Sequence, residues 1–143
     1  MKKENKEQLS KHFTLWEMTR SGTAARLNIK NLPDETEIEA LRALCKNVLE
    51  PLRCRYGGIT ITSGYRCLRL NKAVGGVPSS QHLRGEAADI FVPSLETGRK
   101  YFDFIRTNTV FDQLIWEPRG AVVPRWLHVS FTTRRNNRMQ VLV

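Results

Sequence analysis

The sequence changes its pattern at Gly57-Gly58, and this change constrains the possible folds more than any other feature. Before it, apolar residues recur at helical spacing over residues 33–56, which predicts a long amphipathic helix with acidic residues in its first turn. Pro51 should kink or restart this helix, because proline lacks the backbone N–H that a helix interior uses. The two glycines should end it.

After the glycines, four short runs of β-branched or alternating apolar residues predict strands. These runs are residues 59–62, 87–92, 111–117 and 125–132. A helix over roughly 95–107 separates the second strand from the third, and shorter helical turns are expected from Thr14, within 21–28 and within 67–73. Because helices gather at the front and strands at the back, we predict an α+β fold, with a mostly antiparallel sheet and helices packed on one side.

The length of 143 residues fits one domain. We predict a flexible basic N-terminus over residues 1–11 and a single domain over residues 12–143. The chain contains no run of eighteen apolar residues and no apolar segment of a secretory signal. We therefore expect a monomer without a membrane span that is synthesised, and kept, in the cytoplasm.

The formal net charge of +9 favours polyanionic partners such as nucleic acid, anionic lipid or bacterial wall polymers, although the excess charge can also serve solubility alone. Many of the basic residues lie at the two ends, where we expect solvated tails. No recognition-helix signature accompanies the charge, so specific nucleic-acid binding is not expected. Of the three cysteines, Cys45 is expected to be buried in the long helix, and Cys54 and Cys67 have no assigned role.

Two of the predicted strands place an ionisable side chain on the face opposite their apolar row, namely Asp89 and His128. His82 precedes Asp89 by seven residues, with Gly85 between them to reverse the chain. One interpretation is structural: Asp89 caps a loop or pairs with an arginine, and His128 is a satisfied histidine of the sheet. The other is a catalytic zinc site, because two imidazoles and one carboxylate leave a fourth position open for water.

Several segments together resemble the zinc D-alanyl-D-alanine peptidases and their phage and bacterial cell-wall endopeptidase relatives. They are SGYRCLRLN (63–71), VGG (74–76), SSQHLRGEAADI (79–90), FDQLIWE (111–117) and WLHVSF (126–131). The opening FTLWEMTRSGTAARLNI and the later VLEPLR resemble the compact phage-type branch of this family. The resemblance covers roughly residues 10–135 and implies the hedgehog-like fold of these peptidases.

The resemblance also implies roles for individual residues. His82, Asp89 and His128 would be the ligands of one zinc ion. Arg66 would meet a carbonyl or carboxylate of the substrate and stabilise developing negative charge, and Ser80 would help hold the peptide. Without the resemblance, Arg66 and Ser80 read as ordinary turn residues. The implied substrate is a peptide bond in a peptidoglycan stem peptide, cut by a carboxypeptidase or an endopeptidase.

The general base is the point at which this sequence departs from many relatives, which carry an acidic residue three positions before the last histidine. Here that position is Arg125, and an arginine cannot act as a base. We therefore expect Glu117 to take a proton from the attacking water and pass it to the leaving amine. The alternatives are that Glu117 pairs with Arg119, and that Glu86, expected to be a solvated turn residue, is the base.

Two other functions remain open from the sequence. A non-catalytic wall-binding or structural module would keep the fold, with or without the metal, but lack an acidic side chain at the metal site. A basic nucleic-acid-binding protein would show steeply salt-dependent binding to DNA. If the chain is a peptidase, it would reach the cell wall through phage-type release.

Overall fold

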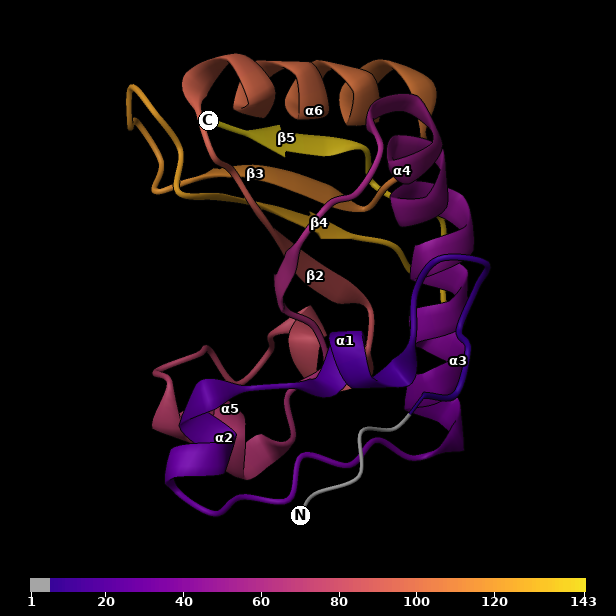
Figure 1. Cartoon of the computed structure of the whole chain (residues 1–143), viewed down its shortest axis with the longest axis vertical. Helices are drawn as coiled ribbons and strands as arrows, with labels where there is room; N and C mark the ends of the chain where they lie inside the picture. Colours follow the sequence, from indigo (N-terminus) through magenta and orange to yellow (C-terminus); the bar gives the residue numbers. More distant parts are fainter. Residues whose placement is uncertain (1–5) are drawn as a thin grey trace.

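The structure is a computed structural model that describes residues 6–143 (Figure 1). The first five residues of the predicted flexible N-terminus lie outside the described residues. Within residues 6–11, Leu9 is buried, and the carbonyl of Glu7 accepts a hydrogen bond of 2.8 Å from the backbone N–H of Leu15. The segment next to the domain is therefore packed against it, and the division at residue 11 stays a prediction.

The described residues form six α-helices, one π-helical turn and one 3-10 turn. They are α1 (Leu15–Thr19), α2 (Gly22–Arg26), α3 (Glu35–Leu44), the π-helical turn η1 (Cys45–Leu49), α4 (Glu50–Tyr56), α5 (Leu68–Ala73), the 3-10 turn η2 (Gln81–Arg84) and α6 (Leu95–Asn108). The predicted long helix is thus α3, η1 and α4 in succession. A proline ring clashes with the carbonyl four residues earlier in a regular α-helix, and the wider turn just before Pro51 relieves this clash.

Five strands form one sheet in the order β1-β2-β4-β3-β5. They are β1 (Ile61–Ser63), β2 (Ala87–Phe91), β3 (Gln113–Glu117), β4 (Trp126–Ser130) and β5 (Gln140–Leu142). The first three pairings in this order are antiparallel, which confirms the predicted α+β fold, but β5 pairs with β3 in parallel. The sheet is therefore mixed. The parallel edge strand β5 was not predicted, because three residues are too few to show a strand pattern in the sequence.

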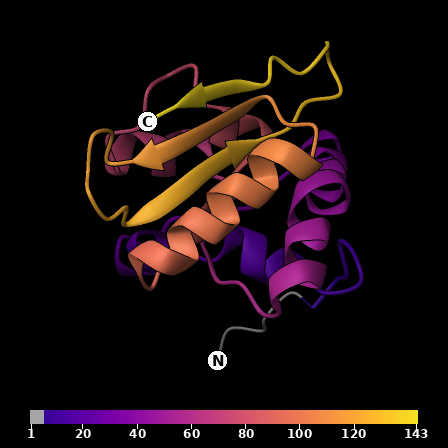
Figure 2. The same cartoon turned by 90° about the horizontal axis from the view of Figure 1, so that it is seen from above.

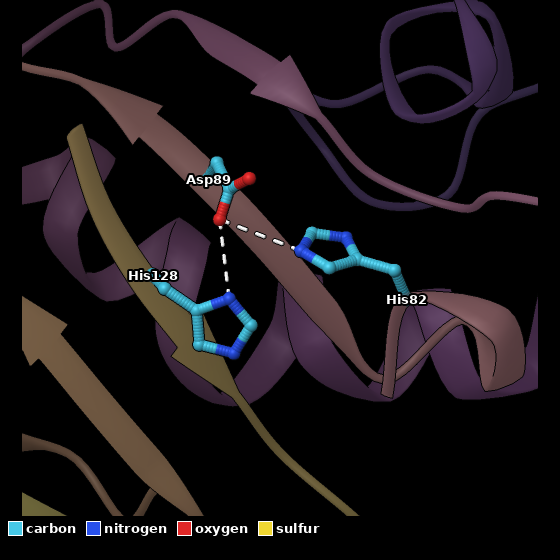
Figure 3. A group of neighbouring side chains, drawn as sticks. All are labelled: His82, Asp89 and His128. Carbon is cyan, nitrogen blue, oxygen red and sulfur yellow. Dashed lines mark hydrogen bonds and ion pairs between the residues drawn. The ribbon is translucent and has the colours of Figure 1, made fainter. Parts of the chain in front are cut away.

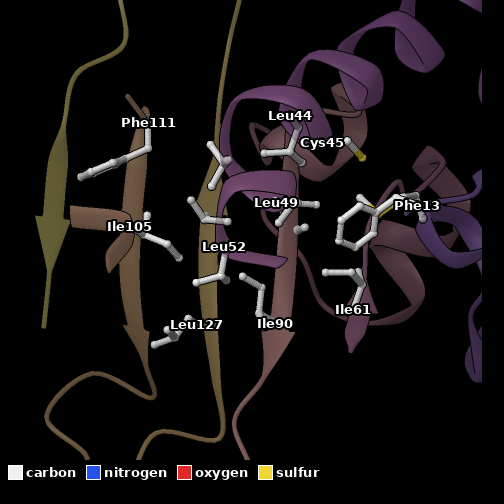
Figure 4. Close-up of a cluster of buried hydrophobic side chains, with 14 of the residues drawn as sticks. Phe13, Leu44, Cys45, Leu49, Leu52, Ile61, Ile90, Ile105, Phe111 and Leu127 are labelled. Atoms are coloured by element: carbon white, nitrogen blue, oxygen red, sulfur yellow. The ribbon is translucent and has the colours of Figure 1, made fainter. Parts of the chain in front are cut away.

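The hydrophobic core lies on one face of this sheet. Figure 2 shows α6 lying across that face, and Phe102 of α6 packs edge-on against Trp116 of β3 with ring centroids 5.5 Å apart. Side chains from α3, η1 and α4 complete the cluster around Ile90 and Leu127 (Figure 4). The opposite face of β2, β3 and β4 carries the polar side chains, so the core fixes which residues face the candidate site. In the described part of the chain, no helix is long and apolar enough to cross a membrane.

Candidate metal centre

The register of the sheet places Asp89 and His128 side by side. They form a directly opposed pair between β2 and β4, and Asp89 Oδ1 lies 3.1 Å from Nδ1 of His128 (Figure 3). Both side chains are largely withdrawn from solvent, each with 14% of the side chain exposed. On the other side of β4, Ile115 of β3 is opposite His128. The site is therefore built on the two central antiparallel pairings of the sheet.

His82 reaches the same place from the turn η2. Ser80 caps this turn, and its Oγ accepts a hydrogen bond of 3.2 Å from the backbone N–H of His82. Gly85 ends the turn in the left-handed region with φ 73°, and a Cβ at this position would lie 2.4 Å from the carbonyl oxygen of Glu37. The predicted reversal at Gly85 is confirmed, since only glycine fits both the dihedral angle and the close approach to α3.

The imidazole of His82 is oriented by a backbone carbonyl. Its Nδ1 lies 2.7 Å from the carbonyl oxygen of Gly64, which accepts hydrogen bonds only, so Nδ1 carries the hydrogen and Nε2 carries the lone pair. Nε2 is buried without a hydrogen-bond partner and lies 3.4 Å from Asp89 Oδ1. A lone pair and a carboxylate oxygen repel one another at this distance unless a cation lies between them.

Burial lowers the pKa of His82, because the imidazolium loses its hydration, and the ring is therefore neutral. Burial alone would raise the pKa of Asp89, but the hydrogen bond from Nδ1 of His128 outweighs it and holds the pKa of that carboxyl well below its usual range. A neutral imidazole and an ionised carboxylate are the protonation states in which these groups bind metal ions.

The three side chains have the spacing of metal ligands. One ligand atom from each of His82, Asp89 and His128 lies within 4.8 Å of the others. Bonds of 2.0–2.1 Å from a tetrahedral zinc ion place neighbouring ligand atoms about 3.3 Å apart, which agrees with the separations of 3.4 Å and 3.1 Å from Asp89 Oδ1 to the two histidines. This group can therefore hold a metal ion with three protein ligands.

A cleft of about 960 Å³ opens in front of the three ligands, and Arg66, Ser80 and Glu117 also line it. The backbone N–H of Arg66 donates to the carbonyl of His82 at 3.0 Å, and its Nη1 donates to Asn71 Oδ1 at 2.9 Å. Burial lowers the pKa of Arg66, while the charge of Asp89 acts in the opposite direction. The structure thus brings six residues predicted from the sequence into one cleft, namely His82, Asp89, His128, Arg66, Ser80 and Glu117, and their roles there stay predictions.

Glu117 ends β3 on the same face as Ile115, and therefore on the face of His128. Its carboxylate makes no hydrogen bond or ion pair with any side chain among residues 6–143. The alternative pairing with Arg119 is not formed, because the guanidinium Nε of Arg119 is directed toward the carbonyl of Val143 at 3.5 Å. Glu117 thus presents an unpaired carboxylate to the cleft.

Glu86 is not the solvated turn residue that we predicted, since only 3% of it is exposed. Its carboxylate accepts hydrogen bonds of 2.8 and 2.9 Å from Arg134, and further bonds from Thr132 and Gln81. It does not line the metal cleft. The prediction was wrong because its partner, Arg134, lies 48 positions later in a segment that we interpreted as a solvated tail.

Sequence reasoning also missed a group at the edge of the cleft. Arg135 and Arg138 line it and both bind Asp112, which has no exposed surface. The signal was present in the sequence as an acidic residue next to a buried strand, which requires a partner. The SGYR segment carries a second missed role, since Gly64 and Arg66 supply backbone groups that position His82.

Two comparisons with known proteins bear on this site. The family model described as Peptidase M15 matches residues 11–130, a span that contains the six site residues predicted from the sequence but not the arginines at positions 134, 135 and 138. A comparison with curated proteins finds no match.

Proposed function

Because the chain belongs to the peptidase M15 family, the zinc D-Ala-D-Ala peptidases, we propose that it hydrolyses a peptide bond in the stem peptides of bacterial peptidoglycan. Peptidases of this family depend on a metal ion. The observation that carries the proposal is the opposition of two metal-binding atoms, His82 Nε2 and Asp89 Oδ1, at 3.4 Å in a buried site that opens into a cleft.

Zinc is the proposed ion, and His82, Asp89 and His128 are its proposed ligands. Two imidazoles and a single carboxylate suit zinc better than calcium or magnesium, which prefer oxygen ligands. Nε2 of His82 and Nδ1 of His128 face Asp89 Oδ1 and would bind the ion together with it. When bound, zinc supplies Lewis acidity, which polarises the scissile carbonyl and makes a water molecule more acidic.

The remaining steps belong to side chains of the cleft. The Glu117 carboxylate takes a proton from the attacking water as the new C–O bond forms, and then delivers this proton to the amine nitrogen as the C–N bond breaks. The Arg66 guanidinium donates to the substrate oxygen on which negative charge develops. Ser80 already accepts a hydrogen bond from the backbone N–H of His82, and its hydroxyl, which donates to no group among residues 6–143, can donate to the peptide backbone of the substrate.

The test combines metal analysis of the purified protein with a digest of peptidoglycan. We expect one zinc ion per chain and new stem-peptide termini for the wild type, loss of both for His82→Ala, and zinc without cleavage for Glu117→Gln. Glu96→Gln is the matched control, because it makes the same change on the exposed surface of α6. Zinc in the wild type without any cleavage would favour the non-catalytic wall-binding module, and full activity without metal would refute the mechanism.

A further inference from the structure

The metal cleft follows the direction of β3. Every second side chain of β3 lies on the cleft face, namely those of Gln113, Ile115 and Glu117. Ile115 is opposite His128, one of the proposed ligands. Strands rise about 3.4 Å per residue, so Glu117 lies about 7 Å from Ile115 in one direction and Gln113 about 7 Å in the other. The metal ligands are therefore near the middle of the cleft, with the proposed base toward one end and Gln113 toward the other.

The Gln113 end is cationic. Between β4 and β5 the chain passes this end, and two of its arginines there bind Asp112, the residue before Gln113. Arg135 contacts Asp112 through both Nη atoms at 2.6 and 3.0 Å, and Arg138 contacts it through Nε and Nη2 at 3.1 and 2.7 Å. Two guanidinium groups thus share one carboxylate, which leaves one positive charge uncompensated.

These two arginines line the cleft, and each retains a donor without a partner among residues 6–143. Asp112 has no exposed surface, whereas 40% of the Arg135 side chain and 46% of the Arg138 side chain are exposed. Nη1 of Arg138 and Nε of Arg135 make no hydrogen bond within the described part of the chain. Since Asp112 already holds both side chains in place, a ligand that binds them meets donors whose orientation is largely fixed.

We propose that Arg135 and Arg138 form a subsite for a carboxylate of the peptide substrate, about two residues from the bond that is cut. The inference rests on the proposed peptidase function and deepens it. A carboxylate fits because guanidinium donors match its planar geometry. The position fits because the arginines bind Asp112 next to Gln113, which lies about 7 Å along β3 from Ile115, and two residues of an extended peptide span about this distance. Both arginines lie beyond the residues that the family model matches, so family membership does not account for them.

The test uses a set of synthetic stem pentapeptides in which each carboxylate is converted to an amide in turn. One amidation should raise the KM of the wild type about tenfold while kcat changes less than twofold, because a charge-assisted contact is lost from binding. Arg138→Gln should raise the KM for the free acid by the same factor and leave the KM for that amide unchanged. Arg138→Lys keeps the charge but not the planar guanidinium group, so its KM for the free acid should lie between those of the wild type and Arg138→Gln.

Arg99→Gln is the matched control, since Arg99 is exposed on α6, on the other face of the sheet. In the Arg138 variants, Asp112 still forms its ion pair with Arg135, so one of the two ion pairs of Asp112 is preserved. The peptide set shows in the wild type whether a carboxylate contributes to KM, and the Arg138 variants then assign that contribution to this subsite rather than to Arg66. Equal KM values for all peptides, or an equal effect of Arg138→Gln on every peptide, would overturn the proposal.

Two further outcomes separate this inference from the function on which it rests. If the wild type cleaves none of the peptides, the peptidase function fails, and calorimetric titration still decides the subsite: tighter binding of the free acid than of one amide supports it, and equal binding overturns it. If Arg138→Gln weakens retention on intact cell walls but leaves every peptide KM unchanged, the arginines bind a wall polymer and the subsite is wrong.

Discussion

Replacing Gly85 with alanine should weaken both the fold and the metal site, and the structure gives the size of each effect. The left-handed conformation at φ 73° costs an alanine about 1 kcal/mol. The new Cβ would lie 2.4 Å from the carbonyl oxygen of Glu37, where an ordinary contact is at least 3.4 Å, so α3 and η2 must separate. Overpacking of this kind costs about 1–3 kcal/mol, which gives a total loss of about 2–4 kcal/mol.

The same movement displaces His82, which lies three residues before Gly85 in η2. His82 depends on contacts with Gly64 and Ser80 for its orientation, and loss of such support lowers metal affinity about 10–100-fold. The assays are urea denaturation for the free energy of unfolding and competition with a chelating dye for the dissociation constant of zinc.

Gly120→Ala is the matched control for Gly85→Ala. Gly120 also has a positive φ, 80°, but nothing lies within 4 Å of its Cβ position. It therefore carries the conformational cost alone, about 1 kcal/mol, with no effect on zinc. If both variants lose the same stability and bind zinc equally, the contact with Glu37 does not hold η2 in place and the reasoning is refuted.

Three further predictions address other parts of the molecule. Asp112→Asn should lower the free energy of unfolding by about 1.5–3 kcal/mol at pH 7, the range for hydrogen bonds to charged groups. Because hydrogen bonds from Arg135 and Arg138 hold the pKa of Asp112 below its usual range, the wild type has this stabilisation above about pH 4 and loses it as the pH falls. The difference in stability between the two proteins, read from denaturation curves, should therefore narrow as the pH falls from about 4 toward about 2.5, and a constant difference would contradict the assignment. Burial raises the pKa of Cys45 to about 12, so iodoacetamide at pH 8 should label exposed Cys54 and leave Cys45 unmodified until the protein unfolds, as read by mass spectrometry. Zinc at about 1,000 times its dissociation constant should add about 4 kcal/mol to the free energy of unfolding of the wild type and nothing to that of His82→Ala.

The local sequence pattern predicted correctly which side chains of a strand share a face. It did not predict contacts between residues that are far apart in the sequence. Alternation in β2 and β4 predicted that Asp89 and His128 point away from the core, because each strand has one apolar row. Their direct opposition depends on the register between strands 39 positions apart, which no local pattern specifies. The same limit explains Glu86 and Asp112, because the arginines that bind them, at positions 134, 135 and 138, lie at least 23 positions later in the chain.

The hydrogen bonds of His82 hold this residue in a fixed orientation before any ligand binds. Three backbone or hydroxyl contacts converge on this residue: Gly64 accepts from its ring, Ser80 accepts from its N–H, and its carbonyl accepts from Arg66. These contacts direct a lone pair at an ionised carboxylate, an arrangement that costs stability on its own. Since rotation of the ring would break the bond to Gly64, the repulsion is not relieved by relaxation of His82. A cation between the two atoms converts it into attraction, so the same contacts that orient His82 should couple metal binding to the stability of η2.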